Sequence, residues 1–507
     1  MLARIGRAGT RCHGTGARGH DFAPVAPYAG QDGPQLSGKA RAAVAGMTKI
    51  EGLMRRAILP LCLMLGACTT ATVGPDTAAT RAAPPQQSAM PPMRVFSTPK
   101  PTPPQRSNRD IARDFLDLAF EMESGRRLPH FSRFEEPVLL RVTGAPPPSL
   151  MADLDRLLHR LRSEAGIDIR LVRDASAQIT IEAVSRDDIR RHLPTAACFV
   201  VPNISRLDQY RSARGTDWTR ITRREKIAIF VPNDTSPQEI RDCLHEELAQ
   251  ALGPLNDLYR LTDSVFNDDN VHAVLTGFDM LILRAYYAPE LRSGMTLSQV
   301  ADRLPAILGR LNPDGDRIAP RYLEATPRAW IEAIQTALGP DIRGPARRAA
   351  AHEALRIAQG RGWTDHRRAF SHFALGRIAQ ANDPGFAQDQ FLRADRFYQR
   401  MPGTALHRAF TAAQLAGFVL ARGDGETALE LLDPHLGTAE RHENAALLAT
   451  LQMLRAEALD LTGRVSEARA VRLDSLGWAR YGYGADWAVR AKLRDIGALN
   501  PLKGPNG

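Results

Sequence analysis

Cysteine, aromatic residues and long apolar runs are all scarce in this sequence. Its 507 residues include five cysteines and 6% aromatics, and no apolar run approaches the roughly 20 residues of a membrane-spanning helix. The formal charge is +10, yet no run of Lys and Arg is dense enough to follow a phosphate backbone. These features exclude a disulfide scaffold and a polytopic membrane protein, and they predict no nucleic-acid partner.

What is present is the composition of a soluble globular protein. Apolar residues make up 44% of the chain and charged residues 24%. A length of 507 residues is too great for one ordinary domain and predicts two or three.

Residues 54–68 carry the features of a secretory signal. Two arginines precede a short apolar core over residues 57–65. That core is far shorter than a membrane span, and the small residues after it suit a cleavage site. The ending Leu65-Gly66-Ala67-Cys68 resembles a bacterial lipobox, which implies that Cys68 carries a diacylglyceryl group. We therefore expect a lipid-anchored, periplasm-facing protein of the cell envelope.

The residues before and after this signal lack the pattern of a folded domain. Residues 1–53 are rich in Gly, Ala and Arg without periodicity, so we expect a disordered, over-extended start, with translation beginning at Met47 or Met54. Residues 69–105 are rich in Pro, Ala, Thr and Ser, which is typical of a stiff, extended tether. Such a tether would hold a globular body away from the membrane surface.

Residues 106–310 alternate between strand and helix patterns. Asn108 is expected to cap an amphipathic helix, and residues 149–165 predict another with leucines along one face. Apolar or alternating runs predict strands over residues 137–143, 167–172, 178–184 and 226–231. This order of elements predicts an α+β domain.

One helix of this region combines clear end signals with a cluster of polar side chains. Ser236-Pro237-Gln238-Glu239 is a capping box with proline at the first helical position. The helix then runs to Leu252 and stops at Gly253, with a buried face of Ile240, Leu244, Leu248 and Leu252. Glu246 and Gln250 lie four residues apart and therefore share a second face.

The stretch from Glu246 to Asn256 resembles the metzincin motif His-Glu-x-x-His-x-x-Gly-x-x-His. In this register the motif glycine is Gly253, the general-base glutamate is Glu247, and the zinc-ligand positions hold Glu246, Gln250 and Asn256. Ser264-Val265-Phe266 is similar to the Ser-x-Met turn of metzincins, and the strand–helix–strand–strand order before the motif also suits a zincin. The resemblance implies a zincin-like domain in which Glu247 would be the catalytic base.

The side chains at the ligand positions differ from those of an active metzincin. Zinc favours Cys, His and carboxylate, whereas Gln250 and Asn256 offer amides. An all-oxygen set suits a hard ion such as calcium better than zinc. Three interpretations stay open: a hydrogen-bonded structural cluster with no cofactor, a site for a non-zinc ion or ligand, and an active metallohydrolase that recruits His245 or His272.

A second resemblance covers more of the same region. The segments His-Glu-Glu-Leu-Ala-Gln-Ala-Leu-Gly (residues 245–253), Ser-Val-Phe-Asn-Asp (264–268) and Leu-Thr-Gly-Phe-Asp-Met (275–280) carry it. They are similar to a family of bacterial lipoproteins described as domain of unknown function 2927. That family has no established activity, so the resemblance implies a domain span and a lipoprotein, and no mechanism.

Cys198 and Cys243 are the cysteines that follow Cys68 in the chain. A secreted chain with one remaining pair favours a disulfide, and two buried free thiols are the alternative. The bridge would hold the motif helix in place, because Cys243 lies one turn before Glu246.

Residues 340–507 have helical periodicity and a loose repeat. Segments beginning at Leu375, Leu415 and Leu454, spaced 40 and 39 residues apart, each predict an apolar helix, a Gly/Asn/Asp turn and a second helix. They resemble tetratricopeptide-type hairpins, with Ala428 and Ala468 where paired helices approach. Such an array offers an extended surface to a protein partner, whereas the alternative is a plain helical bundle packed on the preceding domain.

These patterns together predict an α+β zincin-like domain followed by an all-α, tetratricopeptide-like domain. The leading functional hypothesis is a binding or scaffold module with an inactive zincin-like domain, held to a membrane through Cys68. The alternative is a metallopeptidase with atypical ligands, Glu246, Gln250, Asn256 and His245, and with Glu247 as general base. Metal analysis and a peptide-cleavage screen discriminate between the two.

Overall fold

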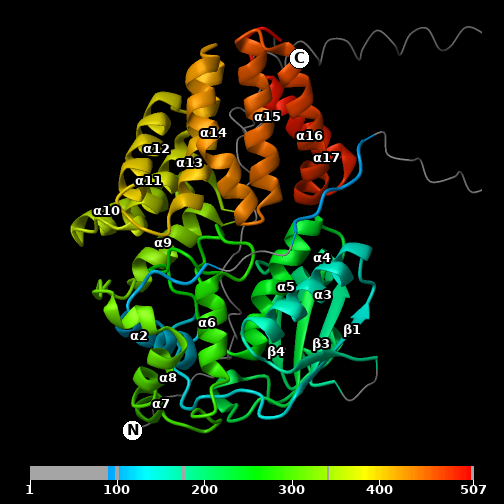
Figure 1. Cartoon of the computed structure of the whole chain (residues 1–507), viewed down its shortest axis with the longest axis vertical. Coiled ribbons are helices and arrows are strands. Elements are labelled where there is room, and N and C mark those ends of the chain that lie inside the picture. The colour runs from blue at the N-terminus through cyan, green and yellow to red at the C-terminus, as the bar shows by residue number, and fades with distance from the viewer. Residues whose placement is uncertain (1–89, 98–101, 174–176, 340–341, 504–507) are drawn as a thin grey trace, which may run out of the picture. The chain divides into compact units, whose positions relative to one another are not determined.

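The computed structural model describes residues 90–97, 102–173, 177–339 and 342–503 (Figure 1). The predictions for the chain start, the signal peptide, Cys68 and the first part of the tether lie outside these residues. Within them, a mixed α/β region is followed by an all-helical region. None of the described helices combines the length and apolar character that crossing a bilayer requires.

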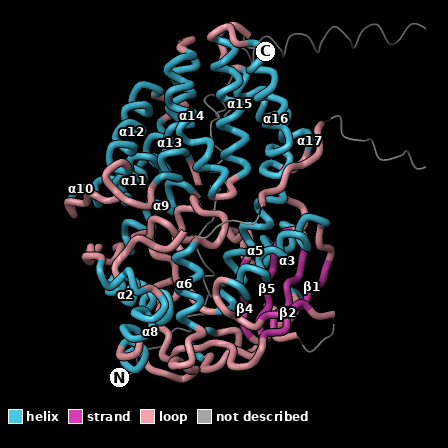
Figure 2. Tube along the Cα trace, in the orientation of Figure 1, coloured by secondary structure: helices cyan, strands magenta, loops and turns pink. Residues whose placement is uncertain are grey.

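Among the described residues, five strands form one sheet in the mixed region (Figure 2). They lie in the order β2-β1-β3-β5-β4, the first four parallel and β4 antiparallel to β5 at one edge. Every residue of β5 is buried, because alternate side chains enter two different apolar clusters. The strands are β1 (Val138–Gly144), β2 (Ile169–Leu171), β3 (Ile179–Val184), β4 (Phe199–Pro202) and β5 (Ile227–Pro232).

Helices surround this sheet, and α3 and α5 pack against each other through leucines of the main core. Leu154, Leu157, Leu244 and Leu248 have at most a trace of exposed surface, as their one-sided spacing predicts. The α-helices are α2 (Asn108–Phe120), α3 (Pro148–Ser163), α4 (Arg186–His192), α5 (Pro237–Leu252), α6 (Gly277–Tyr286), α7 (Leu297–Ala301) and α8 (Leu304–Leu311). Short 3₁₀ turns are η1 (Leu207–Gln209), η2 (Trp218–Arg220) and η3 (Pro313–Arg317).

The first helix begins one residue away from its predicted cap. Ser107 is in an extended conformation and its side chain accepts a hydrogen bond from the Asp110 N–H, so Ser107 is the cap. Asn108 is the first helical residue, and its amide donates to the carbonyl of Asn312 at 2.9 Å. The prediction of Asn108 as cap is therefore wrong, because its side chain is used in a tertiary contact.

The helical region begins earlier than residue 340, since α9 (Arg328–Leu338) already packs against the helices that follow it. Three of the hairpins, α11–α12, α13–α14 and α15–α16, coincide with the segments predicted from Leu375, Leu415 and Leu454. Ala428 and Ala468 are fully buried where the paired helices approach. The remaining helices are α10 (Gly344–Gly360), α11 (His366–Ala379), α12 (Pro384–Tyr398), α13 (Ala405–Ala421), α14 (Gly425–Arg441), α15 (Ala445–Leu461), α16 (Val465–Tyr483) and α17 (Asp486–Gly497).

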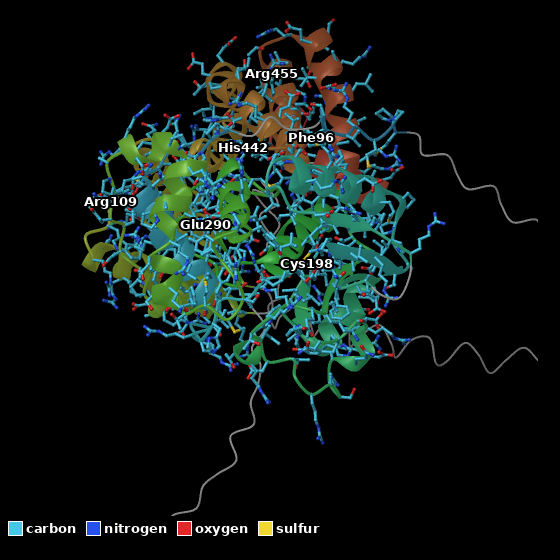
Figure 3. All side chains as sticks on the ribbon, turned by 60° about the horizontal axis from the view of Figure 1, so that its bottom comes forward. Phe96, Arg109, Cys198, Glu290, His442 and Arg455 are labelled. Carbon is cyan, nitrogen blue, oxygen red and sulfur yellow. A yellow bond between two sulfur atoms is a disulfide. The ribbon has the colours of Figure 1, made fainter. Side chains whose placement is uncertain are left out.

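The last part of the predicted tether is packed on the folded chain. Phe96, labelled in Figure 3, is 7% exposed. It stacks on Trp478 of α16, with 4.4 Å between the ring centroids. The backbone N–H of Arg94 donates to the Gly477 carbonyl, and the Phe96 carbonyl accepts from Arg156 of α3 at 2.7 Å. Residues 90–97, which we call the strap, therefore contact both regions, so this part of the predicted tether lies against the folded chain. Phe96 is the buried aromatic side chain of the strap, Met90 packs against the same apolar cluster, and the Pro91 carbonyl accepts from Arg480 at 2.8 Å.

A buried arginine links the two regions beside the strap. Arg241 of α5 is 1% exposed, and it donates to the backbone carbonyl of Glu443 at 2.6 Å. Its guanidinium also lies over the rings of Tyr481 and Phe96, 5.2 and 5.8 Å from their centroids. The motif helix is thereby fixed against the helical region.

Candidate functional site

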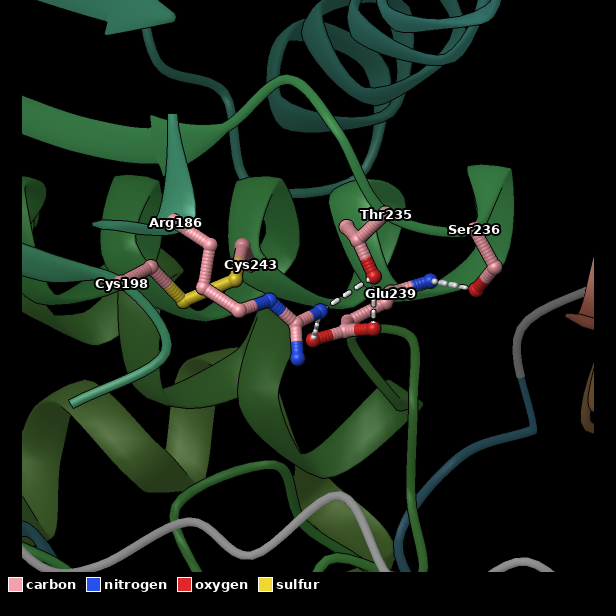
Figure 4. Close-up of a disulfide and its surroundings, with 6 residues drawn as sticks. All are labelled: Arg186, Cys198, Thr235, Ser236, Glu239 and Cys243. Carbon is pink, nitrogen blue, oxygen red and sulfur yellow. Dashed lines mark hydrogen bonds and ion pairs between the residues drawn. A yellow bond between two sulfur atoms is a disulfide. The ribbon is translucent and has the colours of Figure 1, made fainter. Parts of the chain in front are cut away.

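The N-terminus of α5 departs from the predicted capping box. The Ser236 side chain accepts from the Glu239 N–H, as expected. The Glu239 carboxylate, however, binds the guanidinium of Arg186 at 2.6 Å and the hydroxyl of Thr235 (Figure 4). In a capping box the Glu239 carboxylate would accept from the Ser236 backbone N–H. Here it forms an ion pair with Arg186 instead, which joins α5 to α4.

The C-terminus of α5 is held by a buried arginine. Arg224, 3% exposed, donates to the backbone carbonyls of Gln250, Ala251 and Gly253. These carbonyls have no partner within the helix, and a cation is favourable at the negative end of the helix dipole. Burial lowers the pKa of Arg224, and the nearby hydroxyls of Tyr286 and Tyr287 oppose that shift.

A disulfide joins Cys198, directly before β4, to Cys243 of α5 (Figure 4). The pair is separated by 45 residues, and both cysteines are buried. The predicted pairing is thus present in the structure, one turn before Glu246.

The residues at the predicted ligand positions bind separate partners. The Gln250 amide donates to the Glu123 carboxylate at 3.2 Å, and the Asn256 amide donates to the Asp117 carbonyl at 3.0 Å. Glu246 is half-buried and faces a cleft, whereas Glu247 is 2% exposed inside the fold. Within the described part of the chain, no three His, Cys, Asp or Glu side chains gather so as to hold a metal ion.

The two histidines considered as alternative ligands are also engaged. His245 is buried, and its Nδ1 accepts from the Leu275 N–H at 3.1 Å. Burial, together with the nearby Arg160 and Arg241, lowers the pKa of His245 well below its usual value, so the ring is neutral. His272 is 9% exposed, and its Nε2 contacts the Thr262 carbonyl at 3.1 Å.

A cleft of about 510 Å³ lies on the side of α5 that carries Glu246. Its first wall is formed by the start of α4, the β5–α5 connection, α5 itself and the segment before α6. Its second wall is formed by the helical region, from α13 and from the ends of α15, α16 and α17. The lining residues that bear on its chemistry are Arg186, Asp234, Glu239, Asp242, Glu246, His272, Tyr483 and Trp487.

The two walls of the cleft are joined by hydrogen bonds at one end. Gln238 of α5 accepts from the Ala446 N–H at 2.9 Å and donates to the Asn444 side chain at 3.3 Å. Within the second wall, Gly482 allows the backbones of α16 and α15 to approach, because a Cβ there would lie 2.5 Å from the backbone nitrogen of Ala446. The position of the second wall is therefore set by direct contacts with the motif helix.

Asp242 is the carboxylate of the cleft with the most perturbed acidity. Burial raises its pKa to about 7, and the guanidinium of Arg241, 3.5 Å from Oδ1, only partly opposes that shift. At neutral pH this side chain therefore exchanges readily between its charged and neutral forms.

Sequence reasoning located Glu246 and the α5 helix but missed the second wall. Tyr483 and Trp487 belong to helices about 240 residues further along the chain, and no local pattern connects them to α5. The one local signal was Trp487, a tryptophan among polar residues at the start of α17, which could have indicated a binding surface there.

Comparison with protein-family models gives one match. Residues 108–306 match the family "Protein of unknown function (DUF2927)". The match spans the sheet, α5 and the helices through the start of α8, and it bears out that part of the second resemblance. Searches of curated proteins and of solved structures gave no match.

Proposed function

We propose that this chain is a non-catalytic binding module of the cell envelope, with the cleft between α5 and the helical region as its binding site. The observation that carries the proposal is the use of the motif side chains. The side-chain amides of Gln250 and Asn256 donate to the Glu123 carboxylate and to the Asp117 carbonyl. Of the three side chains at the predicted ligand positions, Glu246 is the one that lines the cleft. The helix that would build a catalytic centre in a zincin instead forms one wall of a cleft.

The residues present do not fit a catalytic zinc ion. A catalytic site needs three good donors, and amide side chains are poor ones. Glu247 could serve as a general base only if it reached a metal-bound water, but it is 2% exposed and is not among the residues that line the cleft. This arrangement supports an inactive zincin-like domain over a metallopeptidase.

The same proposal includes a lipid anchor at Cys68 and a helical region of tetratricopeptide-like type. The lipobox-like Leu65-Gly66-Ala67-Cys68 supports the anchor. The consecutive helical hairpins support the repeat interpretation, because each hairpin buries its small residues against its neighbour. The module would then present its cleft, and the surface of its helical array, to partners near a membrane.

The experiment that tests the absence of catalysis is metal analysis of the purified chain, paired with a peptide-cleavage screen. We expect less than stoichiometric zinc and no cleavage that a chelator suppresses. Stoichiometric zinc together with chelator-sensitive cleavage would overturn the non-catalytic proposal.

The anchor has its own test. Replacing the thiol by a hydroxyl in Cys68→Ser removes the nucleophile for lipid transfer, so the protein should move from the membrane fraction to the soluble fraction. Metabolic labelling with a fatty acid should be lost in parallel. Cys62→Ser, six residues earlier in the apolar core, is the matched control and should leave both unchanged.

A further inference from the structure

Exposed apolar side chains are concentrated on one part of the fold. Among the described residues, eleven large apolar side chains are exposed, and five of the eleven lie on the strap, α16 and α17. These five are Met93, Val95, Val465, Leu473 and Trp487. Single exposed apolar residues are normal on a soluble protein, whereas a concentration of them marks an interaction surface.

Polar contacts join four of the five into one surface, which we call the strap face: Met93, Val95, Leu473 and Trp487. Arg94, between Met93 and Val95, pairs with Asp474, the residue after Leu473. Arg480 of α16 donates to the Pro91 carbonyl at 2.8 Å and lies 3.8 Å from Asp486, the residue before Trp487. The strap, blue in Figure 1, accordingly runs beside α16 and α17.

The strap is seated closely on α16, so the exposure of its apolar side chains is a fixed feature. Gly477 makes the close approach possible, because a Cβ there would lie 2.8 Å from the Arg94 side chain and 3.2 Å from the Pro92 carbonyl oxygen. Phe96 is 7% exposed, whereas Met93 is 36% and Val95 62% exposed. The strap therefore buries one apolar side chain and presents two others to solvent.

Arginines outnumber carboxylates on and around the strap face. The arginines are Arg94, Arg469, Arg480, Arg490 and Arg494, and the carboxylates are Asp474, Asp486 and Asp495. Arg480 and Arg490 share Asp486, each at 3.8 Å. Within the described part of the chain, Arg469 and Arg494 form no ion pair. The strap face therefore has an excess of positive charge.

On α17, the apolar and basic side chains share one side of the helix. Arg490 and Arg494 follow Trp487 by three and seven residues, and all three are exposed. The opposite side of α17, with Val489 and Ile496, is buried in the fold. Tryptophan and arginine both combine an apolar body with a polar end, which suits the boundary between lipid headgroups and water.

The chain also enters the described fold at the strap, whose first residue is Met90. Residues 69–89 separate it from Cys68 and can span at most about 70 Å. A lipid on Cys68 would therefore bring the strap face to a bilayer, since the tether ends on that face.

We propose that the strap face docks on the surface of an anionic phospholipid bilayer. Met93, Val95, Leu473 and Trp487 would enter the headgroup region, and the arginines would meet lipid phosphates. The inference rests on the proposed lipid anchor, which supplies the membrane. It goes beyond the anchor by assigning the surface of the folded body that faces the bilayer.

Tryptophan fluorescence tests the proposal at one residue. Of the five tryptophans, Trp487 is 75% exposed, and Trp218, Trp330, Trp363 and Trp478 are at most 8% exposed. Acrylamide should therefore quench mainly Trp487. Vesicles of phosphatidylethanolamine with about one-third phosphatidylglycerol should lower the quenching constant of the full chain at least about twofold.

Trp487→Phe shows where this signal arises. The variant keeps an apolar ring on the strap face but lacks the exposed indole, so vesicles should leave its quenching unchanged. If vesicles do not change the quenching of the unaltered chain, Trp487 remains in water and the proposal is wrong.

Variants of the strap face test the apolar and the basic contribution separately. Leu473→Gln and Arg490→Gln/Arg494→Gln should each remove at least about half of the protection of Trp487. Leu297→Gln, at a 50% exposed leucine of α7, is the matched control and should keep it. Attachment of the chain through residues 57–68 is common to all these proteins. Full protection in both strap-face variants would overturn the proposal.

The lipid composition tests the assignment to an anionic surface. Protection should be weaker on vesicles of phosphatidylcholine alone, and added salt should reduce it on the anionic vesicles. Equal protection on both kinds of vesicle would contradict the assignment.

The anchor and the docking surface fail in different ways. Loss of fatty-acid labelling at Cys68 is the readout of the anchor, and protection of Trp487 is the readout of docking. A labelled chain whose Trp487 stays accessible on vesicles keeps the anchor and refutes docking. An unlabelled chain whose Trp487 is protected refutes the anchor and keeps docking.

Discussion

Arg224 shows how much one buried side chain contributes to the site. Its guanidinium binds three backbone carbonyls at the end of α5 and lies 5.2 Å from the ring centroid of Trp218. Arg224→Met keeps the apolar stem but leaves those carbonyls without their donor, so we expect a loss of about 2–4 kcal/mol in unfolding free energy. Urea denaturation measures it.

The neighbouring Arg223 provides the control for that measurement. Its side chain is 45% exposed and pairs with Glu136 at 3.5 Å. Arg223→Met should therefore cost less than about 1 kcal/mol. Equal losses in both variants would mean that the carbonyl contacts of Arg224 add nothing to stability.

Glu247 is the residue whose substitution discriminates between the proposed non-catalytic module and the metallopeptidase alternative. It is 2% exposed, so Glu247→Gln should lower the free energy of unfolding by about 1–3 kcal/mol, through altered hydrogen bonding of a buried group. Cellular function should then follow the amount of folded protein, measured by quantitative blotting beside a growth or binding assay. A variant that is folded and abundant yet without function would support the metallopeptidase alternative.

At the scale of the element, the disulfide should be the main covalent support of α5. Opening a loop of 45 residues costs about 4 kcal/mol on the chain-entropy account. Reductant should therefore lower the thermal midpoint of unfolding of the wild type. It should not change the midpoint of the double variant Cys198→Ala/Cys243→Ala, and scanning calorimetry measures both. Thiol labelling of the unreduced, denatured protein should find both cysteines blocked, and two reactive thiols would contradict the bridge.

Elements with strong local patterns could be predicted from the sequence, and those that depend on distant partners could not. The predicted strands lie within two residues of β1, β2, β3 and β5, because each has a clear run of β-branched and apolar residues. β4 has four residues and is stabilised by pairing with β5, so its own sequence gave little indication. The same reason explains the site: Glu246 was visible in the α5 pattern, whereas Trp487 and Tyr483 reach the cleft through tertiary packing alone.

At the scale of the whole molecule, buried histidines make the junction of the two regions sensitive to acid. The rings of His272 and His442 lie 5.2 Å apart, one from each region. Burial lowers the pKa of His272 to about 4 and that of His442 to about 3, and the proximity of other histidines adds to both shifts. The unfolded chain therefore binds protons below about pH 6.5 that the folded chain does not, and acid destabilises the fold.

This effect has a defined size and sign. Between pH 7.5 and pH 5, each of the two rings should remove about 2 kcal/mol of stability. Asp242 and Asp279, whose pKa values burial raises to about 7 and about 6, act in the opposite direction, since the folded chain takes up their protons first. Because Asp242 and Asp279 are present in the variants and in the wild type, their contribution to the pH dependence of stability cancels when the proteins are compared.

The histidine contribution is measured by the pH dependence of unfolding in His272→Gln/His442→Gln. The double variant should lose less stability than the wild type on going from pH 7.5 to pH 5, whatever its stability at pH 7.5. His352→Gln, at an exposed position of α10, should reproduce the wild-type dependence. If all three proteins respond alike, the two rings do not govern the acid response.

The strap also determines where a mechanical load enters the molecule. A pull on the chain before residue 90 would first load Met90, which packs against the helical core, and Pro91, whose carbonyl accepts from Arg480 of α16. It would then reach Phe96, which bridges Trp478 of α16 and Arg156 of α3. Tension from a membrane tether would therefore be applied where α16 and α3 meet the strap, and not at a free end of the sheet. In a single-molecule stretching experiment, the first rupture of the wild type should be detachment of this strap, and Phe96→Ala should lower the force at which it occurs.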